Sequence, residues 1–403
     1  MYRPLILFIA VLLGTAGSAC DPASPRPVAL PTRSPIAVSP IVIGALLDIG
    51  NDAGPDSRQQ YDAATLAVEI VNRRGGVALP SGERRPLQLV VFDGAGQASR
   101  VEPTMRRLDA DGVLAVVGPS DPDSTAVARP IAEAAGVPLI ALGGSEASAS
   151  TSWRWTFTLM LPPEEALAAT IAFFAASGVD RFAWLASRTL EATSMRGELG
   201  RLANAANLQI VAEDLYPPGE ESFSPRLSRL HAAEPRVIFA WPRDAFEAAS
   251  IVRESARVRN LAPVFVGPAA ASPPTLSLAG DTPVAVRTVT PRLLVSDDLW
   301  DHDPLTPVIR DFRRELQART GRPPTAASAG AWDAMNLIVT TLETRTPRPA
   351  APTRASLRDG LEATTDYLGA SGPIAFEPRR HDGLDRRALV VARSEGRRWR
   401  LPP

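Results

Sequence analysis

The chain of 403 residues has no lysine, one cysteine and three histidines. The lack of lysine excludes a P-loop lysine, a Schiff-base lysine and a Ser-x-x-Lys nucleophile. A single cysteine excludes an internal disulfide. His231, His302 and His381 are too far apart for the spacing of a metal site. We therefore expect no metal and no cofactor.

The charge balance is close to neutral, with 43 basic and 44 acidic residues. A net charge of -1 gives no electrostatic reason to expect nucleic acid or an acidic membrane surface as a partner. Hydrophobic residues make up 45% of the chain, which is enough for large cores and for two domains.

The N-terminus has the features of an export signal. Arg3 precedes an apolar run and a small-residue stretch, so residues 1–19 are predicted to be a secretory signal peptide. Cys20 follows Gly-Ser-Ala, as at a bacterial lipoprotein cleavage site, and is predicted to carry a lipid. Gly17 stands where leucine is usual, and an incidental cysteine is the alternative. Residues 20–40 are Pro-rich and are predicted to form an extended tether.

One stretch, Gly112 to Ser148, contains a strand, a helix and a second strand. The apolar run Val113–Val117 precedes a polar loop, and helical spacing of apolar residues then continues to Gly136. The second strand, Val137–Leu142, is followed by a loop of small and polar residues. This βαβ unit predicts a parallel sheet with polar loops at the carboxyl ends of its strands, where open α/β sheets bind ligands.

The same alternation continues along the chain. Fully apolar strands and amphipathic helices follow one another on both sides of Trp153–Leu159, which indicates two α/β units. The predicted elements include a strand over Ile41–Leu47, a strand over Val237–Trp241 and a helix over Ala245–Arg257. The fold class is therefore α/β.

Three motifs carry a resemblance to a known family: LAVEIVNRRGGV at 66–77, PIAEAAGVPLI at 130–140 and GPIAF at 372–376. The chain resembles the Leu/Ile/Val-binding family of type 1 periplasmic binding proteins. The resemblance implies two Rossmann-like αβα lobes with a three-segment hinge, crossed near Leu161, Pro291 and Phe376. It also implies lobe I at 41–160 plus 292–376 and lobe II at 161–291 plus 377–403.

The family holds its ligand between the lobes, and the resemblance implies ligand-binding residues in the matching loops. They are Ser120, Asp121, Asp123, Ser124, Gly143, Gly144, Ser145, Glu146 and Trp241. Small residues at 143–145 suit an anion through their free N–H groups. The alternatives are that Asp123 and Ser124 cap a helix, that Glu146 is solvated and that Trp241 belongs to the core.

Several positions depart from the family pattern. Pro122 stands near the usual carboxylate-binding serine, Leu190 where a tyrosine is frequent, and Ala269 or Ala270 where an acid is expected. Because an unpaired zwitterion is costly to bury, an ordinary branched-chain amino acid is disfavoured. The acidic first-lobe loops favour a cationic or amide-bearing ligand.

The resulting hypothesis is a monomeric, extracytoplasmic solute-binding protein that delivers a small polar ligand to an ABC permease. It touches the membrane only through its lipid anchor. A ligand-sensing module of the same fold is the alternative, and no nucleophile–base pair supports a hydrolase. The acidic segment 297–303 lacks the glycine and terminal glutamate of an EF-hand, so a solvated turn is expected there.

Overall fold

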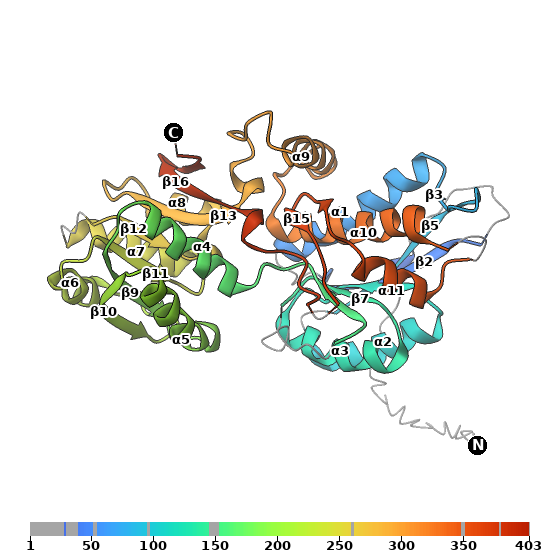
Figure 1. Cartoon of the computed structure of the whole chain (residues 1–403), viewed down its shortest axis with the longest axis horizontal. Coiled ribbons are helices and arrows are strands. Elements are labelled where there is room, and N and C mark those ends of the chain that lie inside the picture. The colour runs from blue at the N-terminus through green and yellow to red at the C-terminus, as the bar shows by residue number, and fades with distance from the viewer. Residues whose placement is uncertain are drawn as a thin grey trace, which may run out of the picture.

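The computed structural model describes residues 28–29, 39–50, 55–94, 97–144, 153–258, 262–347, 351–378 and 380–402. The predicted signal peptide, Cys20, Ser145 and Glu146 lie outside the described residues. The described chain forms two lobes side by side, each with a sheet between layers of helices (Figure 1).

The first lobe contains a six-stranded sheet in the order β1-β5-β2-β6-β7-β8. The strands from β5 to β8 are parallel, and helices α1 and α10 cover one face while α2 and α3 cover the other. Both faces are thus buried, which is why the strands are apolar throughout. The strands are β1 (Val28–Ala29), β2 (Ile41–Leu47), β5 (Leu87–Asp93), β6 (Ala115–Val117), β7 (Leu139–Ala141) and β8 (Thr156–Thr158).

The first lobe also contains helices and two small hairpins. The helices are α1 (Pro55–Arg73), α2 (Ala98–Ala110), α3 (Pro122–Ala135), α9 (Thr306–Thr320), α10 (Ala326–Arg345) and α11 (Arg354–Glu362). The hairpins pair β3 (Val77–Ala78) with β4 (Arg84–Arg85) and β14 (Tyr367–Leu368) with β15 (Pro373–Ile374).

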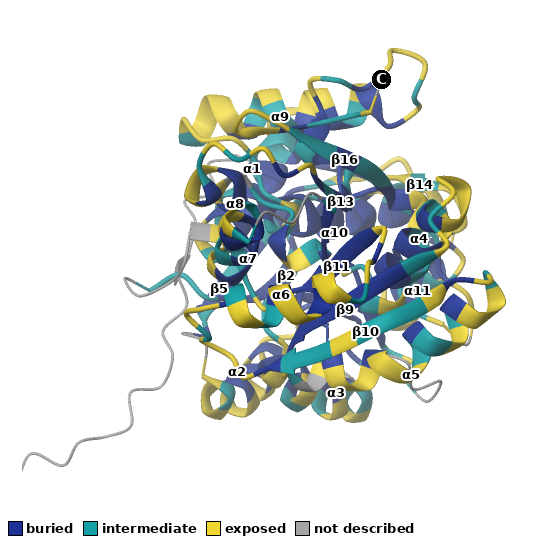
Figure 2. Cartoon of the chain, turned by 90° about the vertical axis from the view of Figure 1, so that its left-hand side faces the viewer, coloured by how far each residue is buried: buried dark blue, intermediate teal, exposed yellow. Residues whose placement is uncertain are grey.

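The second lobe repeats this plan with a seven-stranded sheet in the order β10-β9-β11-β12-β13-β16-β17. Its strands are β9 (Arg181–Ser187), β10 (Gln209–Tyr216), β11 (Val237–Trp241), β12 (Val264–Val266), β13 (Val286–Pro291), β16 (Leu389–Glu395) and β17 (Arg398–Arg400). The last two are antiparallel. Figure 2 shows buried strands beneath helices with exposed outer faces.

Five helices flank this second sheet. On one face lie α4 (Pro163–Ala176) and α5 (Leu190–Ala205). On the other lie α6 (Ser224–Ala232), α7 (Ala245–Arg257) and α8 (Pro273–Ala279). Short 3-10 helices cover 268–270 (η2), 292–295 (η3) and 386–388 (η4).

Three stretches connect the lobes, at 159–162, 292–305 and 375–388, which confirms the three-segment hinge. The third stretch lies along β8, since the Thr158 amide donates to the His381 carbonyl at 2.8 Å and Gly383 donates to Thr158 at 2.9 Å. Leu384 and Ala388 pack into the first-lobe core. The chain therefore joins the second sheet only at β16.

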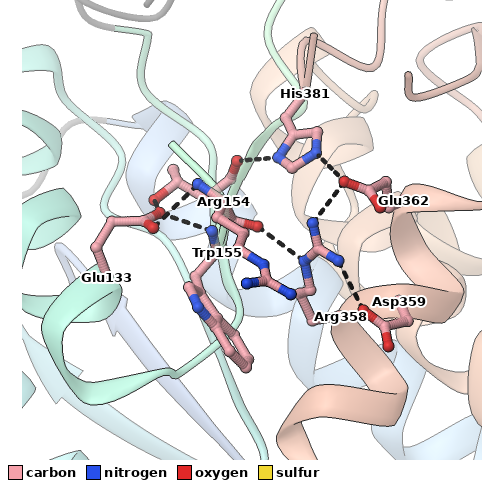
Figure 3. A network of polar contacts seen from close by, with 8 residues as sticks. Glu133, Arg154, Trp155, Arg358, Asp359, Glu362 and His381 are labelled. Atoms are coloured by element: carbon pink, nitrogen blue, oxygen red, sulfur yellow. Dashed lines mark hydrogen bonds and ion pairs between the residues drawn. The ribbon is translucent and has the colours of Figure 1, made fainter. Parts of the chain in front are cut away.

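A polar network fixes this junction (Figure 3). Glu133 of α3 accepts hydrogen bonds from the amides of Arg154 and Trp155, at 3.0 and 2.7 Å. Glu362 of α11 contacts Nε2 of His381 at 3.2 Å, and Nδ1 of the same ring lies 3.0 Å from the Thr156 carbonyl. The entry to β8 and the third hinge stretch are thus held to the helices of the first lobe.

One short strand lies within the predicted tether. Val28 and Ala29 form β1, which pairs antiparallel with Val91 and Val90 of β5. The sequence analysis did not predict this strand, because two residues among prolines show no periodicity. Backbone pairing with a neighbouring edge strand defines β1.

Candidate functional site

Both sheets reverse their strand order at one point. In the first sheet β2 lies between β5 and β6. In the second sheet β9 lies between β10 and β11 in the same way. Ligands of open α/β sheets bind outside the carboxyl ends of the strands at such switch points. The loops after β2 and β6 in the first lobe, and after β9 and β11 in the second, form the candidate site.

The loop after β6 makes a tight turn into α3. Gly118 has a φ of +97°, and a Cβ there would lie 2.1 Å from the Leu46 carbonyl oxygen, so no other residue fits. Asp121 is the N-cap, and its carboxylate accepts from the Ser124 amide at 2.8 Å. Such a cap stabilises a helix by about 1 kcal/mol. The cap is therefore Asp121, and the alternative that Asp123 and Ser124 act as caps was wrong.

The other predicted residues of this loop differ in exposure. Asp123 lies exposed in the first turn of α3, where a negative charge is favourable, and Ser124 is buried. Ser120 is half-buried, and its hydroxyl donates to Oε1 of Gln60 at 2.5 Å. Sequence reasoning missed Gln60, a buried residue of α1. Its only sequence signal is a polar residue on a largely apolar helix face.

At the start of the loop after β7, the backbone amides of two glycines already have partners. The Gly143 amide donates to the Pro119 carbonyl at 2.9 Å, so the expected free N–H at 143 is a wrong prediction. The Gly144 amide lies 3.3 Å from Sδ of Met160, a weak acceptor on a flexible side chain. Met160 is 36% exposed and was not predicted as a site residue. A ligand oxygen can bind the Gly144 amide only by displacing this sulfur.

In the second lobe the predicted aromatic is covered. Trp241 is 3% exposed, packs against Trp184 at 5.9 Å between ring centroids, and donates from Nε1 to Glu191 at 2.8 Å. Its ring thus lies in the core, in line with the alternative. Phe246, in the first turn of α7 just after β11, is 70% exposed. Phe246 is thus an exposed aromatic residue at this edge.

No acid follows β12, but one follows β9 at the same edge of the sheet. Ala269 is exposed and Ala270 is buried in η2, so neither supplies charge. Glu191 is an exposed residue in the first turn of α5, directly after β9, and Trp241 holds one of its oxygens. An acid at a different strand end carries no family-like spacing, which is why the sequence did not reveal it.

The described residues contain no cluster of His, Cys, Asp or Glu that could hold a metal ion. The acidic segment 297–303 is exposed at Asp297 and Asp301, as expected of a solvated turn, and its aspartates also form ion pairs. Its four aspartates pair with arginines: Asp297 with Arg313, Asp298 with Arg400, Asp301 with Arg310 and Asp303 with Arg292. Within the described chain, no helix combines the length and apolarity that a bilayer span needs.

Comparison with known proteins identifies the family. Residues 40–397 match the model of a family described as periplasmic binding protein, and the chain belongs to this family. The family is extracytoplasmic, ligand-binding and non-enzymatic, so this is a solute-binding protein. The predicted family is confirmed. No curated protein matches the chain.

Solved structures support the two-lobed fold. One is an ABC transporter substrate-binding protein from Sphaerobacter thermophilus, 20% identical, TM-score 0.73, covering 89% of this chain and 94% of its own. A substrate-binding protein from Desulfitobacterium hafniense in complex with Leu is 18% identical, with TM-score 0.70 and coverage of 90% and 99%. A branched-chain amino acid transporter substrate-binding protein from Streptococcus pneumoniae, in complex with isoleucine, is 17% identical, with TM-score 0.67 and coverage of 90% and 98%. The predicted fold is thereby confirmed.

Proposed function

We propose that this protein captures a small polar solute, an amino acid, an amide or a related compound, between its lobes and delivers it to an ABC permease. One observation carries the proposal. Polar loops lie at the switch points of both sheets, and the two sheets belong to lobes that three chain segments connect. Open α/β sheets place ligands at this edge.

The contacts proposed for the ligand follow from the chemistry of the edge. The Gly144 amide would bind a carboxylate or amide oxygen once Met160 swings away. The Ser120 hydroxyl would bind such an oxygen by giving up its hydrogen bond to Gln60. Asp123 and Glu191 would bind an ammonium or amide N–H group. Ser145 and Glu146 remain proposed contacts of the first lobe. Glu191 would thus replace the acid that the family has after β12.

A thermal-shift screen with amino acids, amides and small organic acids tests the proposal. Ser120→Ala and Glu191→Gln should each weaken binding of the best compound about tenfold or more, since a charge-assisted or buried hydrogen bond is lost. Glu198→Gln, on the same helix but paired with Arg201, is the control and should bind normally. Equal binding by all variants, or turnover of a bound ester or amide, would contradict the proposal.

The lipid anchor is a separate proposal that rests on Cys20. Cys20→Ala should release the protein from membranes into the soluble fraction, while ligand binding stays unchanged. Retention of the variant on membranes would refute the anchor and leave the binding site unaffected.

Coupling to transport is tested by the genes next to this one. Permease and ATPase genes there support delivery to an importer. A kinase or regulator gene in their place would favour ligand sensing by the same fold.

A further inference from the structure

A cavity of about 340 Å³ lies away from the strand-end loops, where the second hinge stretch meets the C-terminal hairpin. Its charged lining residues are Asp297, Asp298, Arg313, Arg397, Arg398 and Arg400. Arg313 comes from α9, which packs into the first-lobe core. The other three arginines lie in or beside β17 of the second sheet. We name this cavity the arginine pocket.

The arginine pocket has an excess of positive charge. Four arginines face two aspartates, which leaves two positive charges uncompensated. Both carboxylates are already engaged: Asp297 pairs with Arg313, and Asp298 pairs with Arg400 at 2.5 Å while accepting from the Leu401 amide at 3.0 Å. The local acids therefore cannot neutralise the remaining guanidinium groups.

The two remaining arginines are Arg397 and Arg398. Within the described part of the chain, Arg398 makes no ion pair with an acidic residue. Arg397 lies 3.9 Å from Asp281, whose side chain is 90% exposed and does not line the pocket. Such a solvated pair contributes little, so the charge of Arg397 is still available to a ligand.

The positive charges of these arginines act on Asp297, which lines the pocket. The pKa of Asp297 lies below its usual value, chiefly because of the hydrogen bond from Arg313 and further because of the charges of Arg400 and Arg398. The wall is completed by Trp399, which is 5% exposed and whose indole N–H donates to the Ser272 carbonyl at 3.1 Å. Arg398 and Arg400 are the sequence neighbours of this buried ring.

We propose that the arginine pocket binds a small multivalent oxyanion, a di- or tricarboxylate or a phosphate compound, through Arg397 and Arg398. Planar guanidinium groups match carboxylate and phosphate oxygens in geometry. The volume lies within the range of small-molecule sites. Since the lining comes from both lobes, the anion would bind one hinge angle better than another and shift the balance between open and closed forms.

Isothermal titration calorimetry with citrate and with inorganic pyrophosphate tests the proposal on the full chain. At least one should bind, more weakly as ionic strength rises from about 0.05 to 0.5 M. Arg397→Gln combined with Arg398→Gln should weaken binding about tenfold or more, because two charge-assisted contacts are lost. Arg314→Gln is the matched control, since Arg314 lies on α9 beside Arg313 but pairs with Asp311 outside the pocket.

Circular dichroism melting shows whether the double variant is folded, and if it is not, Arg398→Gln alone takes its place. Three results would overturn the proposal: no heat with either anion, an equal loss of binding in Arg314→Gln, or binding only to vesicles that contain anionic lipid. The last result would make the arginine pocket a membrane contact instead of a site for a free anion.

Discussion

Asp333 is a fully buried carboxylate on α10 of the first lobe. It accepts hydrogen bonds from the amides of Ala370 and Ser371 at 2.8 and 2.7 Å, which ties the β14–β15 hairpin to the helix. Burial raises the pKa of Asp333 to about 6, against the lowering effect of these hydrogen bonds. Between pH 4 and 6, the folded state therefore keeps a proton that the unfolded state has already lost.

This difference predicts a pH-dependent stability. The contribution of Asp333 is present below about pH 4 and is lost as the pH rises toward 6, by about 3 kcal/mol in the free energy of unfolding. Asp333→Asn should remove this part of the pH dependence. Urea unfolding of both proteins at several pH values between 4 and 7 measures it. Asp311→Asn, at an exposed position, serves as the control, and identical pH profiles for Asp333→Asn and the parent would contradict the assignment.

Arg129 of α3 is the second buried charged residue of note, at 1% exposure. Within the described chain, none of its three guanidinium nitrogens has a hydrogen-bond partner. Its pKa is lowered by burial, although the charges of Asp382 and Glu133 act in the opposite direction. Its guanidinium carbon lies 5.4 Å from the centroid of the Trp153 ring. Burying a charge in this way costs free energy.

Arg129→Met should therefore stabilise the protein, by about 1–4 kcal/mol, because methionine fills similar space without a charge. Arg107→Met on the exposed face of α2 should leave the free energy of unfolding almost unchanged. Chemical denaturation compares the two. A destabilised Arg129→Met variant would show that the guanidinium has a bound partner, such as water or an anion.

At the scale of elements, the apolar strands were the most predictable part of the chain. The predicted bounds of β2, β11 and α7 match the structure at both ends, because each is a strongly periodic or continuous apolar run. Helix α11 was missed, since only Leu357 and Leu361 mark its inner face. The capping box of Thr353 and Ser356 was the available signal. Strand β17, at 398–400, was also not predicted.

The site was predictable only in part. The polar loops after β6 and β7 could be located because they follow apolar strands. Gln60, Met160, Phe246 and Glu191 could not, since each reaches the strand ends through tertiary packing that leaves no pattern in the sequence. Trp241 was predicted as a site residue but is buried, because an aromatic residue at a strand end can equally belong to the core.

The exposed ring of Phe246 yields a prediction for helix α7. Phe246→Ala should weaken binding of the compound found in the screen about tenfold, because an aromatic contact with the ligand is lost. The melting temperature without ligand should change little, since the ring is 70% exposed. Leu278→Ala, at an exposed apolar position of α8, is the control. Unchanged affinity, or a large loss of stability, would contradict the role of Phe246.

At the scale of the whole molecule, the proposed function requires relative movement of the two lobes. Each lobe has its own core, and the third hinge stretch is fixed to the first lobe by its pairing with β8. A ligand shifts the balance between open and closed forms only as far as it binds the closed form better. The movement must then occur in the short segments 159–162 and 292–305 and at the entry to β16.

The central claim is closure of the lobes on a solute, and a distance across them measures it directly. Helices α3 and α5 lie on the same side of the hinge in both views (Figures 1 and 2). Spin labels at Ala134→Cys and Ser194→Cys, in a Cys20→Ala background that has no other cysteine, report their separation by electron–electron double resonance. The account predicts that the best compound of the screen shortens this distance. An unchanged distance at saturating ligand would contradict it.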